Sequence, residues 1–280
     1  MSAHPAIAIR GPGQEHLSLF DQVAALVDGR DAVALDAPAA DRVRVFFQTA
    51  ASRDEALALL EQALSPSCSV SAEVVDDENW AARSQATLKA VRAGRILVAP
   101  PWDRPRTVAP DEMVVVVRPS LGFGSGHHPS TRLALRALQA LPIRDRDVLD
   151  LGTGSGVLAV AASRLGAGHV SAIDRDPDAV ASARETLTEN GLDGVVSLEV
   201  ADLGTLERPP VPLVLANLTG ATLIRYMPVL TRLTASTGSM VLSGILAEEE
   251  ARVAKAYRQA ATLSWRDQED EWVGMVWRKA

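Results

Sequence analysis

The sequence predicts an α/β protein with a doubly wound parallel sheet, preceded by a small α+β domain. Three observations carry this prediction. From residue 147 onward, short apolar segments typical of strands alternate with helical patterns, as in a doubly wound sheet. A glycine-rich turn at 152–156 follows the first of these strands and opens a helix. Before residue 77 the pattern differs, with short strands around two helical stripes.

The first 76 residues predict the order strand, helix, strand, strand, helix, strand. The predicted strands are AIAI (6–9), AVAL (32–35), RVRVFFQ (42–48) and SVSAEVV (69–75). One helix is predicted over 16–27 from its apolar stripe, and another over 52–64, where Ser52 and Glu55 form a capping box. This order indicates a ferredoxin-like domain. Because such a domain carries no chemistry of its own, we interpret residues 1–76 as a substrate-recognition domain.

Residues 77–110 are interpreted as a linker and residues 111–280 as the second domain. A helix is expected over DDENWAARSQATLKAVRA (76–93), followed by an extended segment interrupted by prolines. The second domain begins with a strand at 113–119 and a glycine loop, GFGSGHHPSTR (122–132), that leads into a helix. Its further strands are predicted at DVLDLG (147–152), HVSAID (169–174), VVSLEV (195–200), VPLVLANL (211–218), SMVLSGIL (239–246) and WVGMVW (272–277).

The formal net charge of −7 is unevenly distributed along the 280 residues. Residues 1–76 hold five arginines against eleven acidic residues, whereas the rest of the chain holds 23 basic against 24 acidic residues. An acidic domain disfavours a nucleic-acid substrate and suits a basic protein partner. The alternative is that this charge serves solubility alone.

Several classes of protein are excluded by simple patterns. The one cysteine, Cys68, excludes an internal disulfide and a cysteine-based metal site. There is no run of 18 apolar residues, and the N-terminal residues lack the pattern of a secretory signal. We therefore expect a cytoplasmic protein without membrane contact.

The glycine turn lies in VLDLGTGSGVLAV (148–160) and indicates the ligand. Glycines stand at three alternate positions, Gly152, Gly154 and Gly156. Val157 stands where a dinucleotide fingerprint would need its third glycine. A strand that ends in an acid, Asp150, before G-x-G-x-G resembles motif I of the class I S-adenosylmethionine-dependent methyltransferases, a Rossmann-like fold. The resemblance implies S-adenosyl-L-methionine as cofactor, with its adenosine and methionine parts against bare backbone. Asp150 would fix the turn and reach the methionine amino group.

Two further acids follow the next predicted strands. Asp174 lies 18 residues after Gly156, close to the roughly 20 at which a carboxylate reaches ribose hydroxyls. The alternative is that Asp174 caps the following helix, whose first turn holds Pro177 and Asp178. Asp202 follows the third strand and is predicted to meet the adenine amino group. For Asp202 the alternative is a solvated loop acid.

Seven stretches between residue 76 and the C-terminus carry a more specific resemblance. They read DDENW (76–80), GRILVAPPWD (94–103), VVRPSLGFGSGHHPSTRLAL (116–135), VLDLGTGSGVLAVAASRLGAGHVSAIDRDPDAV (148–180), LVLANL (213–218), LSGIL (242–246) and EWVGMVWR (271–278). Together they resemble the ribosomal protein L11 methyltransferase family (PrmA). The resemblance implies a ferredoxin-like domain joined by a linker to the catalytic domain. It also implies trimethylation of lysine side chains and of the N-terminal α-amine of one basic ribosomal protein.

Two positions depart from the family pattern. Ser84 stands where members often have a second tryptophan, and Gly220 where the motif Asn-(Ile/Leu)-X-Ala has alanine. These departures bear on the protein substrate more than on the chemistry. Three alternatives stay open: a lysine methyltransferase of another protein, a small-molecule N- or O-methyltransferase, and a cofactor-binding regulatory protein without activity. We expect a monomer.

Asn217 and Leu218 end a predicted strand beside the glycine turn, where ligands of open α/β sheets bind. We interpret these two residues as the acceptor site. The Asn217 side-chain oxygen and the Leu218 carbonyl would accept hydrogen bonds from an amine and aim its lone pair, with Asn217 also beside the cofactor. The alternative is that Asn217 is a turn residue. No aromatic side chain follows it to stack on a flipped base, which favours a protein amine over nucleic acid.

The glycine loop at 122–131 is expected to close over the cofactor. Phe123 would shield the cofactor from water. The predicted contacts with it are Ser125, His127 and Thr131. A metal site at His127 and His128 is disfavoured because no HExxH spacing or thiol accompanies them, so no metal is expected. A general-base role for His127 stays an alternative.

Overall fold

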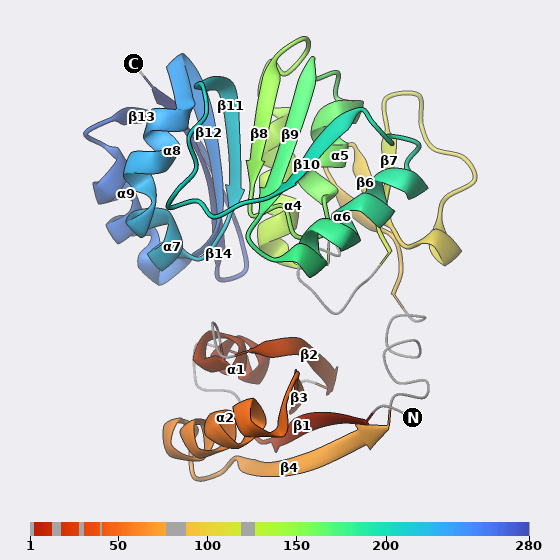
Figure 1. The fold of residues 1–280 in the computed structure, drawn as a ribbon, viewed down its shortest axis with the longest axis vertical. Helices are drawn as coiled ribbons and strands as arrows, with labels where there is room; N and C mark the ends of the chain where they lie inside the picture. The colour runs from red at the N-terminus through yellow and green to blue at the C-terminus, as the bar shows by residue number, and fades with distance from the viewer. Residues whose placement is uncertain are drawn as a thin grey trace. The chain divides into compact units, whose positions relative to one another are not determined.

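The chain forms two compact units, Met1–Leu88 and Lys89–Ala280. The computed structural model describes residues 3–12, 18–27, 31–39, 41–76, 88–118 and 127–279. The smaller unit holds a four-stranded sheet, and the larger unit holds the doubly wound sheet together with a sheet of three short strands (Figure 1). In the described part of the chain, no helix is both long enough and apolar enough to cross a membrane.

The N-terminal unit has an antiparallel sheet in the order β2-β3-β1-β4. Its elements are β1 (Ala3–Arg10), α1 (Leu19–Val27), β2 (Ala32–Ala39), β3 (Arg42–Phe47), α2 (Ala50–Ala63) and β4 (Ser69–Asp76). Both helices pack on one face of the sheet, where Ile7, Val45 and Leu60 are fully buried. This order and packing give the ferredoxin-like arrangement that the sequence predicts.

Helix α2 begins two residues earlier than the sequence predicts. Its N-cap is Thr49, whose hydroxyl accepts a hydrogen bond from the Ser52 N–H at 3.1 Å. The expected capping box of Ser52 and Glu55 is therefore wrong, because Ser52 already lies inside the first turn. Threonine and serine can both cap a helix. Because β3 ends at Phe47, the helix can begin directly after Thr49, and Thr49 is therefore the cap.

The large sheet has the order β10-β9-β8-β11-β12-β14-β13. Its strands are β8 (Asp147–Leu151), β9 (His169–Asp174), β10 (Val196–Val200), β11 (Val211–Asn217), β12 (Thr234–Leu246), β13 (Ala261–Glu269) and β14 (Trp272–Lys279). The five strands from β10 to β12 are parallel, whereas β14 is antiparallel to β12 and β13 to β14. Strand β13 is absent from the sequence prediction because most of its residues are exposed and polar.

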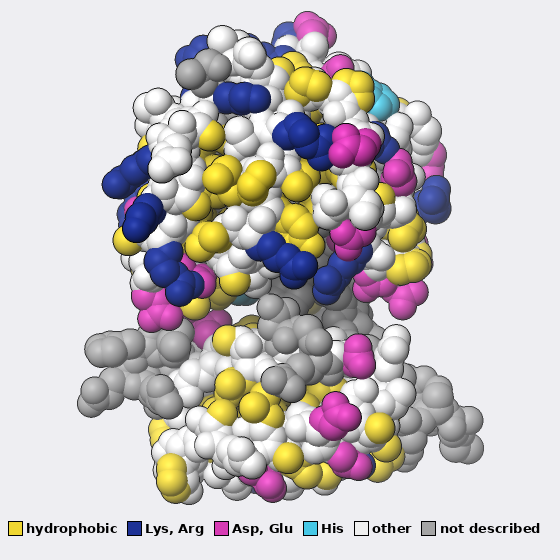
Figure 2. All heavy atoms as spheres, turned by 60° about the vertical axis from the view of Figure 1, so that its left-hand side comes forward, with side chains coloured by type: hydrophobic (Ala, Val, Ile, Leu, Met, Phe, Trp, Pro, Cys, Tyr) yellow, Lys and Arg dark blue, Asp and Glu magenta, His cyan; other side chains and the backbone are white. Residues whose placement is uncertain are grey.

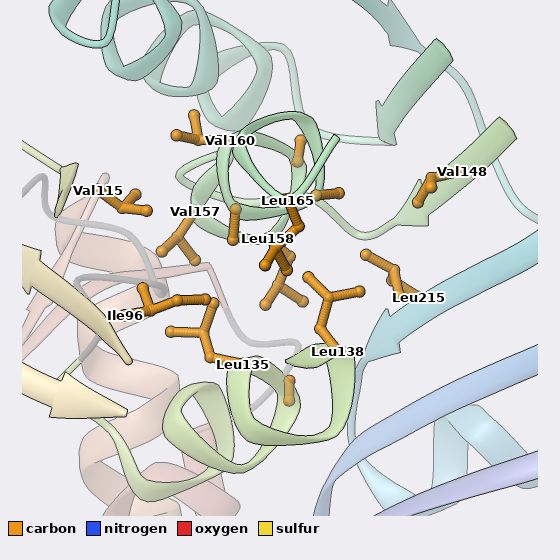
Figure 3. Close-up of a cluster of buried hydrophobic side chains, with 14 of the residues drawn as sticks. Ile96, Val115, Leu135, Leu138, Val148, Val157, Leu158, Val160, Leu165 and Leu215 are labelled. Atoms are coloured by element: carbon orange, nitrogen blue, oxygen red, sulfur yellow. The ribbon is translucent and has the colours of Figure 1, made fainter. Parts of the chain in front are cut away.

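Two layers of helices cover this sheet. One layer holds α4 (Pro129–Gln139), α5 (Val157–Arg164) and α6 (Pro177–Glu189), and the other α7 (Gly220–Arg225), α8 (Met227–Leu233), η2 (Ala247–Glu249) and α9 (Glu250–Tyr257). Alternate strand residues face the two layers: Val148 packs toward α4 and α5, and Leu149 toward the opposite layer. Figure 3 shows the first of these cores, with side chains from α4, α5 and the sheet in one cluster. Burial on both faces explains the nearly continuous apolar runs of these parallel strands.

The end of the predicted linker helix is a strand. Residues Val91–Ala93 form β5, which pairs antiparallel with β6 (Ile96–Ala99), and β6 pairs parallel with β7 (Met113–Val116); η1 (Pro101–Asp103) follows β6. The side chain of Gln139 in α4 donates to the Ala93 carbonyl at 2.8 Å and accepts from the Arg95 N–H at 2.9 Å. These contacts with α4 come from tertiary packing, which overrides the helical pattern. The predicted helix residues 77–87 lie outside the described residues.

Candidate cofactor and acceptor site

The predicted site residues come from strand ends that meet at one edge of the large sheet. Strands β8, β9, β10 and β11 are parallel, so their carboxyl ends lie at the same edge. The strand order reverses at β8, which lies between β9 and β11. Ligands of open α/β sheets bind outside the strand ends at such a reversal. The residues after β8 and those after β11 therefore flank the expected binding position.

The turn after β8 has three glycines in the left-handed region. Their φ angles are +71° at Gly152, +52° at Gly154 and +79° at Gly156, the residue that precedes α5. Residues other than glycine rarely adopt this backbone conformation, so the turn favours glycine at these three positions. The N–H groups of Gly152 and Thr153 both donate to the Ile173 carbonyl, at 2.9 and 3.0 Å. This pair of bonds ties the turn to the adjacent strand β9.

Asp150 lies under this turn and is fully buried. Its Oδ2 accepts a hydrogen bond from the Thr153 hydroxyl at 2.7 Å, which anchors the turn from below. Burial raises the pKa of the Asp150 carboxyl to about 7, and the charge of Asp174 adds to this rise, whereas the Thr153 hydroxyl and the Ala159 N–H oppose it. A carboxyl with this pKa changes its charge readily when a cation binds nearby. Its contact with a methionine ammonium stays a prediction.

Asp174 connects the glycine turn to the start of α6. Its Oδ2 accepts from the Gly154 N–H at 2.9 Å, and its Oδ1 accepts from the Asp176 N–H at 3.1 Å. The N-cap of α6 is Asp176, whose side chain accepts from the Asp178 N–H at 2.9 Å. The alternative interpretation of Asp174 as the helix cap is therefore wrong. The carboxylate lies at the end of β9 and is partly exposed, as a ribose ligand requires.

Asp202 is exposed two residues after β10. Its Oδ1 accepts from the Gly204 N–H at 2.6 Å, so it shapes the turn that follows. The preceding residue, Ala201, donates its N–H to the Asp174 carbonyl at 2.9 Å. Asp202 therefore lies at the same sheet edge as Asp174, and its contact with adenine stays a prediction.

Asn217 is the last residue of β11. The nitrogen of its side-chain amide has a hydrogen-bond partner among the described residues, and the oxygen has none. The Asn217 Nδ2 donates to the Thr131 Oγ1 at 3.4 Å, a long hydrogen bond to a fully buried hydroxyl of α4. The Asn217 Oδ1 is buried and has no hydrogen-bond partner among the described residues. A buried acceptor without a donor is costly and is rare in native proteins. An N–H group of a bound ligand would satisfy it.

Leu218 brings the acceptor motif into contact with the glycine turn. A Cβ atom at Gly152 would lie 2.5 Å from the Leu218 Cδ2, so the leucine side chain packs directly on the bare backbone of that glycine. The Leu218 N–H donates to the Ser243 carbonyl of β12 at 3.0 Å. The predicted cofactor turn and the predicted acceptor residues are thus packed against one another.

The histidines before α4 have structural partners. The His127 Nε2 lies 2.8 Å from the Lys89 carbonyl oxygen. His128 is the N-cap of α4, and its ring meets the Trp272 ring edge-on with 4.5 Å between centroids. Burial, together with the charge of Arg132, lowers the pKa of His128 to about 4, so its ring is neutral at pH 7.

Within the described ranges, no three His, Cys, Asp or Glu side chains gather as a metal site requires. Phe123 and Ser125 lie outside the described residues.

Sequence reasoning missed two neighbours of Asn217 and Leu218 in β12, Ser243 and Gly244. The Ser243 hydroxyl, fully buried, donates to the Ser130 carbonyl of α4 at 2.8 Å. Gly244 has a φ of +80° at an irregularity in the pairing of β12 with β14. A glycine inside an apolar strand pattern signals a bulge or a close backbone approach, and SMVLSGIL carries that signal.

Gly220, where the family pattern has alanine, lies at the start of α7. A Cβ atom at this position would lie 2.6 Å from the Glu249 Oε2. The Glu249 carboxylate therefore takes up the space that an alanine methyl group would need. Because this carboxylate is the end of a flexible side chain that can turn aside, the contact does not explain the departure.

Comparison with known proteins agrees with the geometry. Residues 19–280 match the family model described as ribosomal protein L11 methyltransferase (PrmA). The chain belongs to the PrmA family. The match confirms the predicted family, the class I methyltransferase fold, and S-adenosylmethionine as cofactor.

Several PrmA relatives are similar over most of their length. The ribosomal protein L11 methyltransferase of Pelobacter propionicus is 41% identical over 214 residues, covering 74% of this chain and 68% of that protein. That of Geobacter sulfurreducens is 37% identical over 246 residues, covering 84% and 81%. The solved structure of a ribosomal protein L11 methylase from Lactobacillus delbrueckii subsp. bulgaricus is 26% identical, with a TM-score of 0.64 over 69% of this chain and 100% of that one.

Proposed function

We propose that this chain methylates amino groups of ribosomal protein L11, on lysine side chains, on the N-terminal amine, or on both. The observation that carries the proposal is the Asn217 Oδ1, buried without a donor next to a turn suited to a nucleoside. The N–H of an amine supplies the missing donor. Relatives that bear the name ribosomal protein L11 methyltransferase, at 41% and 37% identity, support this substrate.

The residues proposed to hold the cofactor lie around the glycine turn. The backbone of the turn Gly152–Gly156 would contact the adenosine and methionine parts on the side away from Leu218 and Ala183, which fill the Cβ positions of Gly152 and Gly156. Asp174 would accept from the ribose hydroxyls, because each of its oxygens uses one lone pair on a backbone N–H and keeps another. Asp202 would accept from the adenine amino group, and Asp150 would lie toward the methionine ammonium. Contacts of Phe123, Ser125 and His127 with the cofactor are part of the same proposal.

The chemistry requires alignment more than activation. S-adenosylmethionine supplies a methyl group that is already activated on a sulfonium. The Asn217 Oδ1 and the Leu218 carbonyl would accept hydrogen bonds from the N–H groups of a neutral amine. These two bonds would direct the nitrogen lone pair along the line of attack. With the amine held by Asn217 and Leu218, its lone pair would form the nitrogen–carbon bond as the carbon–sulfur bond breaks with its electron pair going to sulfur, and the proton from nitrogen would pass to water. The neutral, buried His128 is not needed as a base.

The N-terminal unit is proposed to recruit the protein substrate. Its residues 1–76 carry five basic against eleven acidic side chains. Figure 2 shows acidic side chains spread among apolar ones over one face of this unit. A basic ribosomal protein complements that charge, whereas nucleic acid is repelled by it. We also propose that the enzyme is a monomer and that it acts in the cytoplasm, where ribosomal proteins are made.

The deciding experiment labels purified L11 with radioactive S-adenosylmethionine and locates the label by mass spectrometry. Wild-type enzyme is expected to label amines of L11, and where the labelled amine is a lysine side chain, the lysine-to-arginine variant of L11 at that position is expected to lose the signal. Asn217→Ala is expected to bind the cofactor within about twofold of wild type but to lower kcat by about a hundredfold or more, because only the orientation of the nucleophile is lost. Label in a small molecule instead of L11 would contradict the proposal. Loss of cofactor binding in Asn217→Ala would contradict the acceptor role.

A further inference from the structure

Gly244 lies where strand β12 bends beside the proposed acceptor residues. Its neighbour Ser243 pairs with Asn217 across the parallel strands β11 and β12, and the Ser243 carbonyl holds the Leu218 N–H at 3.0 Å. On the other side of β12, the pairing with β14 shifts register between Leu242 and Ile245. With a φ of +80°, Gly244 turns the backbone of β12 at this irregularity.

The approach of Gly244 to the two proposed acceptor oxygens is very close. A Cβ atom at Gly244 would lie 2.5 Å from the Leu218 carbonyl oxygen, 2.9 Å from its carbonyl carbon and 3.1 Å from the Asn217 Oδ1. The first two of these atoms are backbone, which cannot turn aside as the end of a flexible side chain can. A methyl group at this position must therefore displace the Leu218 peptide, and it crowds the Asn217 amide as well.

We propose that Gly244 is a positioning residue for methyl transfer: its missing side chain sets where the Asn217 and Leu218 oxygens stand and so determines how the amine is aimed. The inference rests on the acceptor role proposed above for these two residues. We expect a shift of a fraction of an ångström at Leu218 to leave cofactor binding largely intact, because the glycine turn is anchored separately, to the Ile173 carbonyl and to Asp150. It shifts the two oxygens that would fix the direction of the nitrogen lone pair, and methyl transfer is sensitive to that direction.

The chain offers two matched controls for Gly244→Ala. Gly191 and Gly194 have φ angles of +66° and +73°, and a Cβ atom at either would meet no atom within 4 Å. Gly191→Ala and Gly194→Ala therefore impose a similar backbone strain without displacing anything. All three variants are assayed with full-length L11 for kcat and KM, and with S-adenosylmethionine by calorimetry.

Gly244→Ala is expected to lower kcat by about 10- to 100-fold while the cofactor Kd and the KM for L11 stay within about twofold of wild type. The two control variants are expected to keep wild-type kcat. If Gly244→Ala does not fold, Gly244→Asn decides instead, because asparagine tolerates a positive φ while its Cβ makes the same approach to Leu218; it is expected to lower kcat by at least about tenfold with cofactor binding intact. A kcat for Gly244→Ala equal to the controls, or for Gly244→Asn equal to wild type, overturns the inference.

Asn217→Ala, assayed in parallel, separates this inference from the proposed function. An active Asn217→Ala enzyme means that the proposed acceptor site is wrong. An inactive Asn217→Ala enzyme together with an unimpaired Gly244→Ala enzyme means that the acceptor site stands and the positioning role of Gly244 is wrong.

Discussion

Asp174 accepts hydrogen bonds from two backbone N–H groups, one in the glycine turn and one before α6. A ribose would add its hydroxyls to the remaining lone pairs of the same carboxylate. We predict that Asp174→Ala weakens cofactor binding by roughly 1–3 kcal/mol, because both the ribose contact and the anchor of the Gly154 N–H are lost. Calorimetry with S-adenosylmethionine measures this. Asp178→Ala, an exposed acid in the first turn of α6, is the control and is expected to bind as wild type. Equal affinities for the two variants would contradict the ribose role.

Asp150 makes stability depend on pH in an unusual direction for an acid. Burial raises its folded-state pKa to about 7 from the ordinary value of 3.8. The folded state therefore binds more protons than the unfolded state between these two values, and stability falls as pH rises through this window. We predict that Asp150→Asn removes this fall, so the free energy of unfolding changes less between pH 5 and pH 8 than in wild type. Urea unfolding at both pH values tests it, with Asp147→Asn, exposed at the start of β8, expected to behave as wild type.

Spacing along the chain is sufficient to propose Asp150, Asp174 and Asn217 as site residues, because each lies at or near the end of an apolar strand with a motif directly attached. The residues that contact them cannot be predicted in this way. Thr131 contacts Asn217 from 86 residues away in the sequence, and Gly244 of β12 contacts Leu218 at the end of the neighbouring strand β11. Such contacts depend on strand order and on where β12 bends, which local sequence does not specify.

Helix α4 is joined to the edge strand β13 by a cluster of four charged side chains. Arg132 and Arg136 both donate to the Glu269 carboxylate, and Arg136 also donates to Asp267 at 2.8 Å. Burial raises the pKa of Glu269, but the hydrogen bonds from the two arginines outweigh it and hold this pKa below its ordinary value. The folded-state pKa is depressed, so this stabilisation is present at neutral pH and is lost as pH falls through the folded-state pKa.

We predict that Glu269→Gln lowers the free energy of unfolding by about 1–2 kcal/mol at pH 7, since two partly buried guanidinium groups lose a charged acceptor. Urea unfolding measures the change. Glu248→Gln, at an exposed glutamate of η2, is expected to leave stability unchanged. If the two variants unfold alike, the cluster contributes nothing to the attachment of β13.

At the level of elements, strands with continuous apolar runs are predictable and those without are not. Strands β8, β9 and β11 are buried on both faces, so their sequences are nearly continuous apolar runs. β13 is an edge strand whose side chains are largely exposed, so ATLSWRDQE has no apolar run to mark it. β5 consists of three residues, and its pairing with β6 and its contacts with α4 outweigh a helical pattern.

The division of the chain into two units leads to a prediction about recruitment. Deleting residues 1–76 is expected to preserve cofactor binding, because the glycine turn and Asp174 belong to the second unit. Methylation of intact L11 is expected to fall sharply, since a tethered substrate presents its amines at high local concentration. Methylation of a short lysine peptide is the control and is expected to be unchanged. With full-length enzyme, activity on L11 is expected to fall as salt rises if charge contributes to recognition. A truncated enzyme that methylates intact L11 as well as the full-length enzyme would contradict the recruiting role.

The proposed acceptor site is assembled from α4, β11 and β12, whose contributing residues lie between Thr131 and Gly244. This has a consequence for recombination between relatives. A crossover within those 114 residues joins parts of the site from two parents, and the Leu218 contacts with Gly152 and Gly244 must then fit across the junction. A crossover near Leu88 separates no such pair and follows the boundary between the two units. If the first unit recruits the protein substrate as proposed above, chimeras exchanged at that point take their chemistry from one parent and their choice of protein from the other.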